Sequence, residues 1–392
     1  MKKPRRKTFL VFGKPFIGKE EIAEVVDTLK SGWWGTGPKT EVFEKKFAEY
    51  TSATYALGVN SATAGLHLAL KALGVGPGDE VITTPLTFVS TVNVIIHCGA
   101  TPVFADVERD TWNIDPKEIE KKITRKTKAV IPVHLHGRPC DMDAILGLAQ
   151  DHKLVVVEDA AHAAEAVYKG KKIGSVGDVT VFSFYVTKNI ATGEGGMVTT
   201  KDRRLAESMR ILSLHGLSRD AYKRYSVKYY RNYESVVPGF KYNLTDVASS
   251  IGIHQLERVE ANWKIREMHW NTYVRAFRTV PELILPAAED HRTKHARHLF
   301  ALLLRLEKLS ISRDQFIDQL IKMNIGSGVH FNPVHLHMYF RKTFGFCEGM
   351  FPNAEYIGSR TVSLPLGANL TDKDVADVIA AVRWLIGHNR KS

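Results

Sequence analysis

The stretch Leu154–Asp159, which reads LVVVED, is the most apolar short run in the chain and ends in two carboxylates. A short run rich in β-branched residues is typical of a strand buried on both faces, as strands of parallel sheets are. Similar runs occur on either side of it, separated by segments with helical periodicity. We therefore predict that Leu154–Glu158 is one strand of a larger sheet.

The sequence around this run alternates between strand-like and helix-like segments. The further predicted strands are Glu80–Thr84, Pro102–Val107, Lys128–His134, Val179–Phe184 and Met197–Thr200. The predicted helices between them are Ala62–Leu73, Phe88–Cys98, Pro116–Ile123, Met142–Asp151 and Asp202–Leu212. Because a helix between two strands carries the chain back across the sheet, this alternation predicts an α/β fold with a mostly parallel sheet between helices.

The two ends of the chain differ from this pattern. Residues 19–31 predict an amphipathic helix with Ile22, Val25, Val26 and Leu29 on one side, ended by Gly32. A long helical pattern runs from Thr245 to about Val280 and is expected to connect two domains. Beyond it, His298–Leu306, Gly328–Phe331 and Thr361–Leu364 are predicted strands, and Ser312–Met323 and Asp372–Ile386 are predicted helices. We expect a basic tail (residues 1–15), a large domain (16–250) and a small C-terminal α+β domain (251–392).

Composition and charge narrow the class of protein. The 392 residues are 24% charged and 44% hydrophobic, which is typical of globular domains and excludes disordered, collagen-like and coiled-coil proteins. No run reaches the roughly 18 apolar residues that a membrane-spanning helix needs, since Leu299–Leu304 is stopped by Arg305. The net charge is +12, but outside the first seven residues the basic side chains are dispersed among acids. We expect neither a nucleic-acid nor a membrane partner.

Cysteine usage and the N-terminal sequence indicate the compartment. Cys98, Cys140 and Cys347 lie far apart, so they predict neither a disulfide framework nor a zinc site. The basic start is followed only by the short apolar stretch Phe9–Phe12, with no cleavage signal. We expect a cytoplasmic chain.

Polar residues follow several predicted strands, at the edge of the sheet where parallel α/β proteins bind ligands. Asn60–Thr63 opens a predicted helix, where free backbone N–H groups bind phosphate. Asp159 follows three valines, so its carboxylate needs a cation or a donor opposite it. Lys188 follows the strand Val179–Phe184 and precedes a glycine-rich turn, and Phe88 lies at a strand-to-helix turn.

Each of these signals has a plainer explanation when taken alone. Asn60–Thr63 and Asp159 both suit helix caps, most lysines are solvated surface residues, and an aromatic residue is ordinary core. Together they supply a phosphate-binding helix start, a buried carboxylate, a lysine nucleophile and a flat aromatic side chain, each after a different strand. This set matches pyridoxal 5′-phosphate, with Lys188 as the residue that bonds to the cofactor and Asp159 as the partner of its ring nitrogen.

The chain also resembles the nucleotide-sugar aminotransferases of the DegT/DnrJ/EryC1/StrS family, which are fold-type I pyridoxal-phosphate enzymes. The resemblance runs from about Phe16 to the C-terminus through the blocks SGWWGTGP, VNSATAGLHLAL, GDEVITTPLTFVSTVN, GATPVFADV, VIPVHLHG, VEDAAHA, FSFYVTKNI, EGGMV, PGFKYNLTD and SLPL. It implies a fold-type I large domain with a smaller C-terminal domain. A branch of the family consists of dehydratases that carry histidine in place of the lysine, so Lys188 implies transamination.

The resemblance implies roles for single residues. Lys188 and Asp159 would be catalytic, and Phe88 would stack on the cofactor ring. His162 would lie near the ring hydroxyl, where many relatives carry glutamine. The residues expected at the cofactor phosphate are Ala62, Thr63 and Ser183.

Other implied residues concern the partner subunit and the substrate. The segment PGFKYNLTD would reach into the neighbouring site of a homodimer, with Lys241 and Asn243 in place of the Asn and Arg of many relatives. Each keeps a donor, and which of the two meets the phosphate stays open. The residues expected near the substrate are Tyr185, His330 and Arg219, the last in a basic stretch that could meet a nucleotide diphosphate or simply form a solvated surface loop.

The implied reaction is transfer of the amino group of glutamate, which leaves as 2-oxoglutarate, to a nucleotide-diphosphate keto sugar. Several blocks are most similar to the enzymes that make UDP-4-amino-4-deoxy-L-arabinose, with the 4-amino-4,6-dideoxyhexose synthases close behind. We therefore expect amination at C4 of a sugar used in surface-polysaccharide or antibiotic biosynthesis, with C3 amination as the alternative.

Two readings from other classes compete with this one. Residues 13–19 fit the phosphate-binding pattern G-x-x-x-x-G-K of nucleotide triphosphatases, but Glu20 replaces the Ser or Thr that would hold Mg²⁺. His330, His335 and His337 could be metal ligands, yet no carboxylate or cysteine lies beside them in sequence. We expect no metal.

Overall fold

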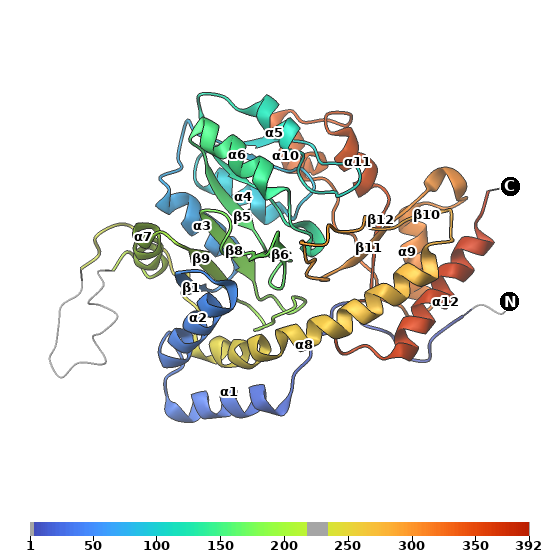
Figure 1. Cartoon of the computed structure of the whole chain (residues 1–392), viewed down its shortest axis with the longest axis horizontal. Helices are drawn as coiled ribbons and strands as arrows, with labels where there is room; N and C mark the ends of the chain where they lie inside the picture. The colour runs from blue at the N-terminus through green and yellow to red at the C-terminus, as the bar shows by residue number, and fades with distance from the viewer. Residues whose placement is uncertain (1–3, 218–233, 392) are drawn as a thin grey trace.

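A seven-stranded sheet lies at the centre of the larger of two lobes in the computed structural model, which describes residues 4–217 and 234–391 (Figure 1). The strand order is β1-β9-β8-β5-β4-β2-β3. The strands are β1 (Tyr55–Val59), β2 (Glu80–Thr83), β3 (Thr101–Phe104), β4 (Thr127–Ile131), β5 (Val155–Asp159), β8 (Val179–Ser183) and β9 (Gly196–Thr200). Pairing is parallel from β8 to β3, whereas β9 runs antiparallel to β8 and β1. The predicted mostly parallel sheet is confirmed.

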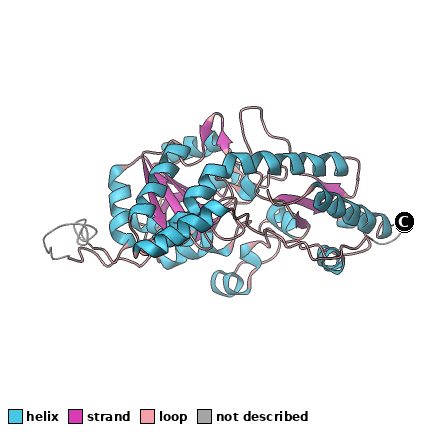
Figure 2. Ribbon diagram, turned by 90° about the horizontal axis from the view of Figure 1, so that it is seen from below, coloured by secondary structure: helices cyan, strands magenta, loops and turns pink. Residues whose placement is uncertain are grey.

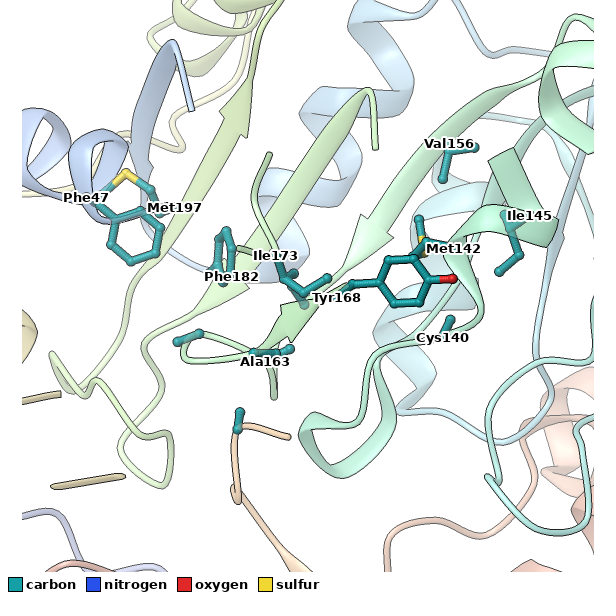
Figure 3. Packing of buried hydrophobic residues seen from close by; sticks show 14 of the residues in the cluster. Phe47, Cys140, Met142, Ile145, Val156, Ala163, Tyr168, Ile173, Phe182 and Met197 are labelled. Carbon is teal, nitrogen blue, oxygen red and sulfur yellow. The ribbon is translucent and has the colours of Figure 1, made fainter. Parts of the chain in front are cut away.

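Helices cover both faces of this sheet (Figure 2). One face packs against α3 (Ala62–Ala72), α4 (Val89–His97) and α7 (Arg203–Ser213). The other packs against α2 (Pro38–Thr51), α5 (Pro116–Lys122), α6 (Met142–His152) and the first half of α8 (Asp246–Phe277). Because neighbouring strand residues point to opposite faces, Val157 joins the first core and Val156 the second, beside Met142 and Ile145 (Figure 3). This two-sided burial explains the uninterrupted valines of β5.

The helix α1 (Lys19–Ser31) forms where it was predicted, but its apolar side faces outward. Ile22 is 60% exposed, whereas Glu21 and Thr28 are fully buried. The Glu21 carboxylate accepts hydrogen bonds from the Gly18 N–H and from Gln255, and it forms an ion pair with Arg258 of α8. Polar contacts to α8 therefore decide which side of α1 is buried.

The helix α8 serves both lobes. Thr245 caps it, as the predicted start at that residue implies. Leu256 and Val259 belong to the core of the large lobe, and Tyr273 and Phe277 to that of the small lobe. The expected domain boundary after residue 250 thus falls within the first turns of a helix that both cores share.

The small lobe is an antiparallel sheet packed against two helices. Its strands are β10 (Leu283–Ile284), β11 (Phe300–Leu304) and β12 (Thr361–Leu364), and its helices are α9 (Arg313–Lys322) and α12 (Asp372–His388), capped by Ser312 and Thr371. The expected strand Gly328–Phe331 is wrong. Gly328 makes a single bridge to Ser363, after which the chain leaves the sheet.

Three further parts complete the described chain. A small hairpin is formed by β6 (Val167–Tyr168) and β7 (Lys171–Lys172). Helices α10 (Met338–Phe344) and α11 (Pro352–Gly358) pack with Phe104 of β3, so part of the expected small domain lies against the large lobe (Figure 1). Within residues 4–217 and 234–391, no helix is both long and apolar enough to cross a bilayer. All three cysteines are free.

Residues 4–15, the described part of the expected tail, contact the small lobe. Arg6 binds Asp374 and Asp377 of α12 at 2.6 Å each, and Leu10 forms a bridge with Ile325. Leu10 also packs against the core of the small lobe. The positive charge of this segment predicted a tail, but the ion-paired Arg6 and the apolar Leu10 attach it to the small lobe.

Candidate active site

A cavity of about 340 Å³ opens at the carboxyl ends of β5 and β8, and residues of both lobes line it. The predicted site residues among its lining are Ala62, Thr63, Phe88, Asp159, His162, Ser183, Tyr185, Lys188 and His330. The fold therefore brings together side chains that lie as far apart in the sequence as Ala62 and His330. Lys241 and Asn243 are not among the lining residues, and Arg219 lies outside the described residues.

Lys188 lies on the turn that follows β8, where its backbone N–H donates to the carbonyl of Tyr185 at 2.8 Å. Removal from water lowers the pKa of its amine to about 8, and the nearby Asp159 carboxylate acts in the opposite direction. A lysine with this pKa loses its proton within about one pH unit of neutrality. It can therefore act as a nucleophile and as a base.

Asp159 ends β5 with a side chain that is 5% exposed. One carboxylate oxygen accepts a hydrogen bond from Thr91 at 2.8 Å, and the other accepts one from the backbone N–H of Ala161 at 3.1 Å. Burial raises the pKa of this carboxyl, while the Thr91 hydrogen bond, the Ala161 N–H and Lys188 oppose that shift. No helix begins at Asp159, so the plain helix-cap explanation does not apply.

The N-terminus of α3 forms one end of the cavity. Ser61 caps this helix by accepting from the Ala64 N–H at 3.1 Å, so the cap explanation holds for Ser61. The N–H groups of Ala62 and Thr63 have no acceptor among the described residues, and both residues line the cavity. A side chain on Gly196 would lie 2.8 Å from the Ala62 nitrogen, so glycine allows β9 to approach this helix end. The arrangement can bind phosphate through backbone donors and the hydroxyl of Ser183.

Four histidines gather at the cavity. His162, His298 and His330 line it, and His136 makes hydrogen bonds to His162 and to the backbone carbonyl of His330. Nδ1 of His162 accepts from the His136 N–H at 3.2 Å, and its ring stacks on Phe331 with a centroid distance of 5.9 Å. Burial lowers the pKa of His162 well below its ordinary value. A neutral ring with Nδ1 as acceptor carries its proton on Nε2.

Lys241 and Asn243 lie beside the phosphate end without entering it. The amide of Asn60 donates to the Lys241 carbonyl at 3.1 Å, and the amide of Asn243 donates to the Thr36 hydroxyl at 2.7 Å. The Lys241 side chain is exposed. Neither residue completes the cavity of its own chain.

Sequence reasoning missed several lining residues. Phe12 stacks on His330 with a centroid distance of 5.7 Å, and Gly13 lines the cavity beside it. Both were assigned to the tail. Thr91 lies one turn after Phe88 and could have been found as the hydroxyl facing Asp159. His298 precedes the apolar run of β11, where a polar residue before a buried strand was the available signal.

The cavity fits pyridoxal 5′-phosphate on this structure's own features. It offers unpaired backbone donors at the N-terminus of α3, a buried carboxylate that lacks a full countercharge, and a lysine whose pKa is lowered to about 8. The described residues form neither the nucleotide-triphosphate site at residues 13–19 nor the histidine metal site considered as alternatives. The Gly18 N–H at the start of α1 is taken by the Glu21 carboxylate, which would repel a phosphate. His335 binds Glu355, whereas His330 binds Ser363, and in residues 4–217 and 234–391 no group of three His, Cys, Asp or Glu could hold a metal.

Known proteins share this sequence and architecture. The model of the DegT/DnrJ/EryC1/StrS aminotransferase family matches residues 15–383. The chain is 53% identical to the spore coat polysaccharide biosynthesis protein SpsC of Bacillus subtilis, covering 97% of this chain and 98% of SpsC. It is also 53% identical to an uncharacterized protein of Methanocaldococcus jannaschii, over 98% of this chain and 100% of that protein. Spr1654 of Streptococcus pneumoniae, described as a candidate sugar aminotransferase, matches in its PLP form with a TM-score of 0.90 and 34% identity, covering 97% and 99% of the two chains.

Proposed function

The chain belongs to the DegT/DnrJ/EryC1/StrS aminotransferase family and is a pyridoxal-phosphate-dependent sugar aminotransferase, and we propose that it carries the amino group of glutamate to C4 of a nucleotide-diphosphate keto sugar. The observation that supports this most strongly is Lys188, a lysine with a lowered pKa that shares one cavity with a buried carboxylate and a phosphate-binding helix end. The similarity to SpsC supports a product used in surface-polysaccharide biosynthesis.

Residues of this chain would hold the cofactor and move the proton during transfer. The bound cofactor supplies an electron sink that stabilises negative charge on the carbon next to the transferred nitrogen. Asp159, whose carboxylate accepts hydrogen bonds from Thr91 and the Ala161 N–H, would keep a positive charge on the ring nitrogen. The N–H groups of Ala62 and Thr63, with the Ser183 hydroxyl, would hold the cofactor phosphate. Lys188 takes up and returns the proton at the reacting carbon, a transfer that contributes about 10²–10⁴-fold in rate.

The remaining residues of the cavity suit the two substrates. His162, whose Nδ1 accepts from the His136 N–H, would offer its Nε2–H to the ring hydroxyl of the cofactor. His330, on which Phe12 stacks, and Tyr185 line the cavity and would contact the sugar. Arg219 and its basic neighbours remain candidates for the nucleotide diphosphate by sequence alone.

A homodimer with shared sites is part of the proposal. Two large apolar side chains at the cavity are exposed, with Phe88 at 58% and Tyr185 at 45%. Lys241 is exposed and does not line the cavity of its own chain, although it lies on the segment expected to serve a site. A second copy of the chain would cover the exposed rings and place its Lys241 and Asn243 near the cofactor phosphate.

The proposal is tested by supplying purified holoenzyme with glutamate and a panel of UDP-, GDP- and dTDP-linked 4-keto and 3-keto sugars. We expect 2-oxoglutarate to form in step with one 4-amino sugar product, identified by mass spectrometry and NMR. Exclusive turnover of a 3-keto sugar would overturn the C4 assignment. Turnover with alanine or glutamine but not glutamate would overturn the donor.

A further inference from the structure

A chain of buried hydrogen bonds runs from the small lobe to the cavity beside Lys188. Arg266 of α8 pairs with Glu165, both almost fully buried, and its Nε donates to the Arg297 carbonyl at 3.1 Å. Glu165 accepts from the amide of Asn189 at 2.7 Å. Asn189 is the residue directly after Lys188 in the chain. Its amide oxygen lies 2.9 Å from Nδ1 of His298, which lines the cavity.

This series of hydrogen bonds fixes the orientation of the Asn189 amide. Its nitrogen donates to Glu165 and also to the Ala296 carbonyl at 3.2 Å, so both of its protons point at acceptors. A flipped amide would place its oxygen against the Glu165 carboxylate, which is unfavourable. The oxygen of Asn189 therefore faces His298, and an amide oxygen can only accept.

The Asn189 oxygen in turn fixes the tautomer of His298. Nδ1 must carry a proton to donate to it. Burial, together with Lys188, His330 and Arg266, lowers the pKa of His298 well below its ordinary value, so the ring is neutral. Its Nε2 then has a free lone pair and, among the described residues, no hydrogen-bond partner. The neighbouring His162, whose ring centroid is 4.5 Å away, has the opposite tautomer with a proton on Nε2.

We propose that Nε2 of His298 accepts a hydrogen bond from a hydroxyl group of the sugar substrate and so sets which sugars are held with their keto carbon next to Lys188, with Asn189 as the residue that positions it. This rests on the proposed function. The chemistry distinguishes the two substrates, because a lone pair attracts a hydroxyl but repels the carboxylates of an amino-acid donor. A buried acceptor also rejects a sugar that lacks the hydroxyl, since the Nε2 lone pair of His298 would then remain without a hydrogen-bond donor.

The kinetic test separates the two half-reactions in single-turnover experiments that follow the cofactor absorbance. Holoenzyme is mixed with glutamate, and the aminated enzyme is mixed with the keto sugar found best in the panel above. In His298→Phe we expect the rate with keto sugar to fall about 10–100-fold more than the rate with glutamate, the usual effect of losing a hydrogen bond to a buried polar group. His298→Gln, whose amide oxygen can accept, should recover part of that loss.

The matched control is His295→Phe. His295 is also buried and lies three residues earlier, but it does not line the cavity. Its substitution should leave the ratio of the two half-reaction rates as in the wild type, even if the protein is less stable. Equal losses in both half-reactions for His298→Phe would overturn the inference and leave the proposed function standing. Failure of the wild type with every keto sugar would instead overturn the proposed function.

A second readout needs no cofactor. In protein labelled with ¹⁵N-histidine and freed of cofactor, the imidazole nitrogens report which one carries the proton, and His298→Phe identifies the signal. We expect protonation at Nδ1 of His298 in the wild type and its loss in Asn189→Leu. A wild-type His298 protonated at Nε2 would overturn the inference.

Discussion

At the residue scale, Lys188 and Asp159 act on each other through their charges. Desolvation lowers the pKa of Lys188 to about 8, and the Asp159 carboxylate keeps it from falling further. We therefore predict that the Lys188 amine in cofactor-free protein becomes reactive as the pH rises through about 8. Trace acylation with peptide mass spectrometry measures this, and a short lysine-containing peptide serves as the reference, since lysines in peptides titrate near pH 10.4.

The same experiment checks the cause of the shift. Asp159→Asn removes the negative charge that stabilises the ammonium, so the midpoint of Lys188 should move to lower pH. A midpoint that stays unchanged would show that the two groups are not coupled. A midpoint near that of exposed lysines in the wild type would show that Lys188 is solvated.

Asp159→Asn also tests the role of the carboxylate in turnover. The amide can keep both contacts, with its oxygen on the Ala161 N–H and its nitrogen on Thr91, whose hydroxyl can turn to Thr87 at 2.9 Å. The cofactor should therefore bind with little loss. Without the negative charge the ring nitrogen loses its proton, and kcat should fall roughly 10²–10³-fold, as when a preorganised electrostatic partner is removed. Wild-type kcat with weakened cofactor binding would contradict this assignment.

The sequence could predict the residues whose chemistry is unusual for their position. Asp159 was visible because a charge after three valines is costly, and Lys188 because it shares the sheet edge with Asp159. Phe12 and His298 were not, because their place in the cavity depends on how the N-terminal segment and β11 pack against the large lobe. Residue type and local pattern do not carry that information.

At the element scale, α1 shows a limit of periodicity. Its pattern predicted a helix correctly, but the buried side is set by the Glu21 contacts with Gly18, Gln255 and Arg258 rather than by its apolar residues. The apolar stripe is left exposed. Six of the seven strands of the central sheet were predicted, all except β1, because burial on both faces leaves a continuous apolar run in the sequence.

We predict that Glu21→Ala lowers the free energy of unfolding by about 2 kcal/mol, because it leaves buried donors of Gln255 and Arg258 without an acceptor. The matched control is Glu20→Ala. Glu20 also meets Arg258, at 3.2 Å, but its side chain is 44% exposed, so its loss should cost below about 1 kcal/mol. Denaturant unfolding of both variants measures the difference. Equal effects would mean that α1 is not held through Glu21.

At the scale of the whole molecule, the cavity draws on more of the chain than one lobe. The two-lobed arrangement and the long helix that connects the lobes were expected from the change of pattern at about Thr245, but the return of α10 and α11 to the large lobe and the packing of Leu10 against the small lobe were not. Those features follow from long-range packing. Phe12 and His330 from the small-lobe side line the same cavity as Lys188 of the large lobe, so neither lobe alone holds the full set of lining residues.

The position of Lys241 and Asn243 outside their own cavity leads to the last prediction. If these residues serve the partner's site, Lys188→Ala and the double variant Lys241→Ala, Asn243→Ala should each be inactive or strongly impaired as homodimers. Mixed dimers, however, contain one site with an intact Lys188 from one chain and an intact segment from the other. Co-refolding the two variants should restore activity, up to about one working site in each mixed dimer.

Two differently tagged chains allow the mixed species to be purified, and sedimentation checks its size. If the mixed dimer stays as inactive as the variants, or if a monomer turns over substrate, each cavity uses residues of its own chain alone. Restored activity would instead require the dimer, because no rearrangement within one chain can supply both missing parts.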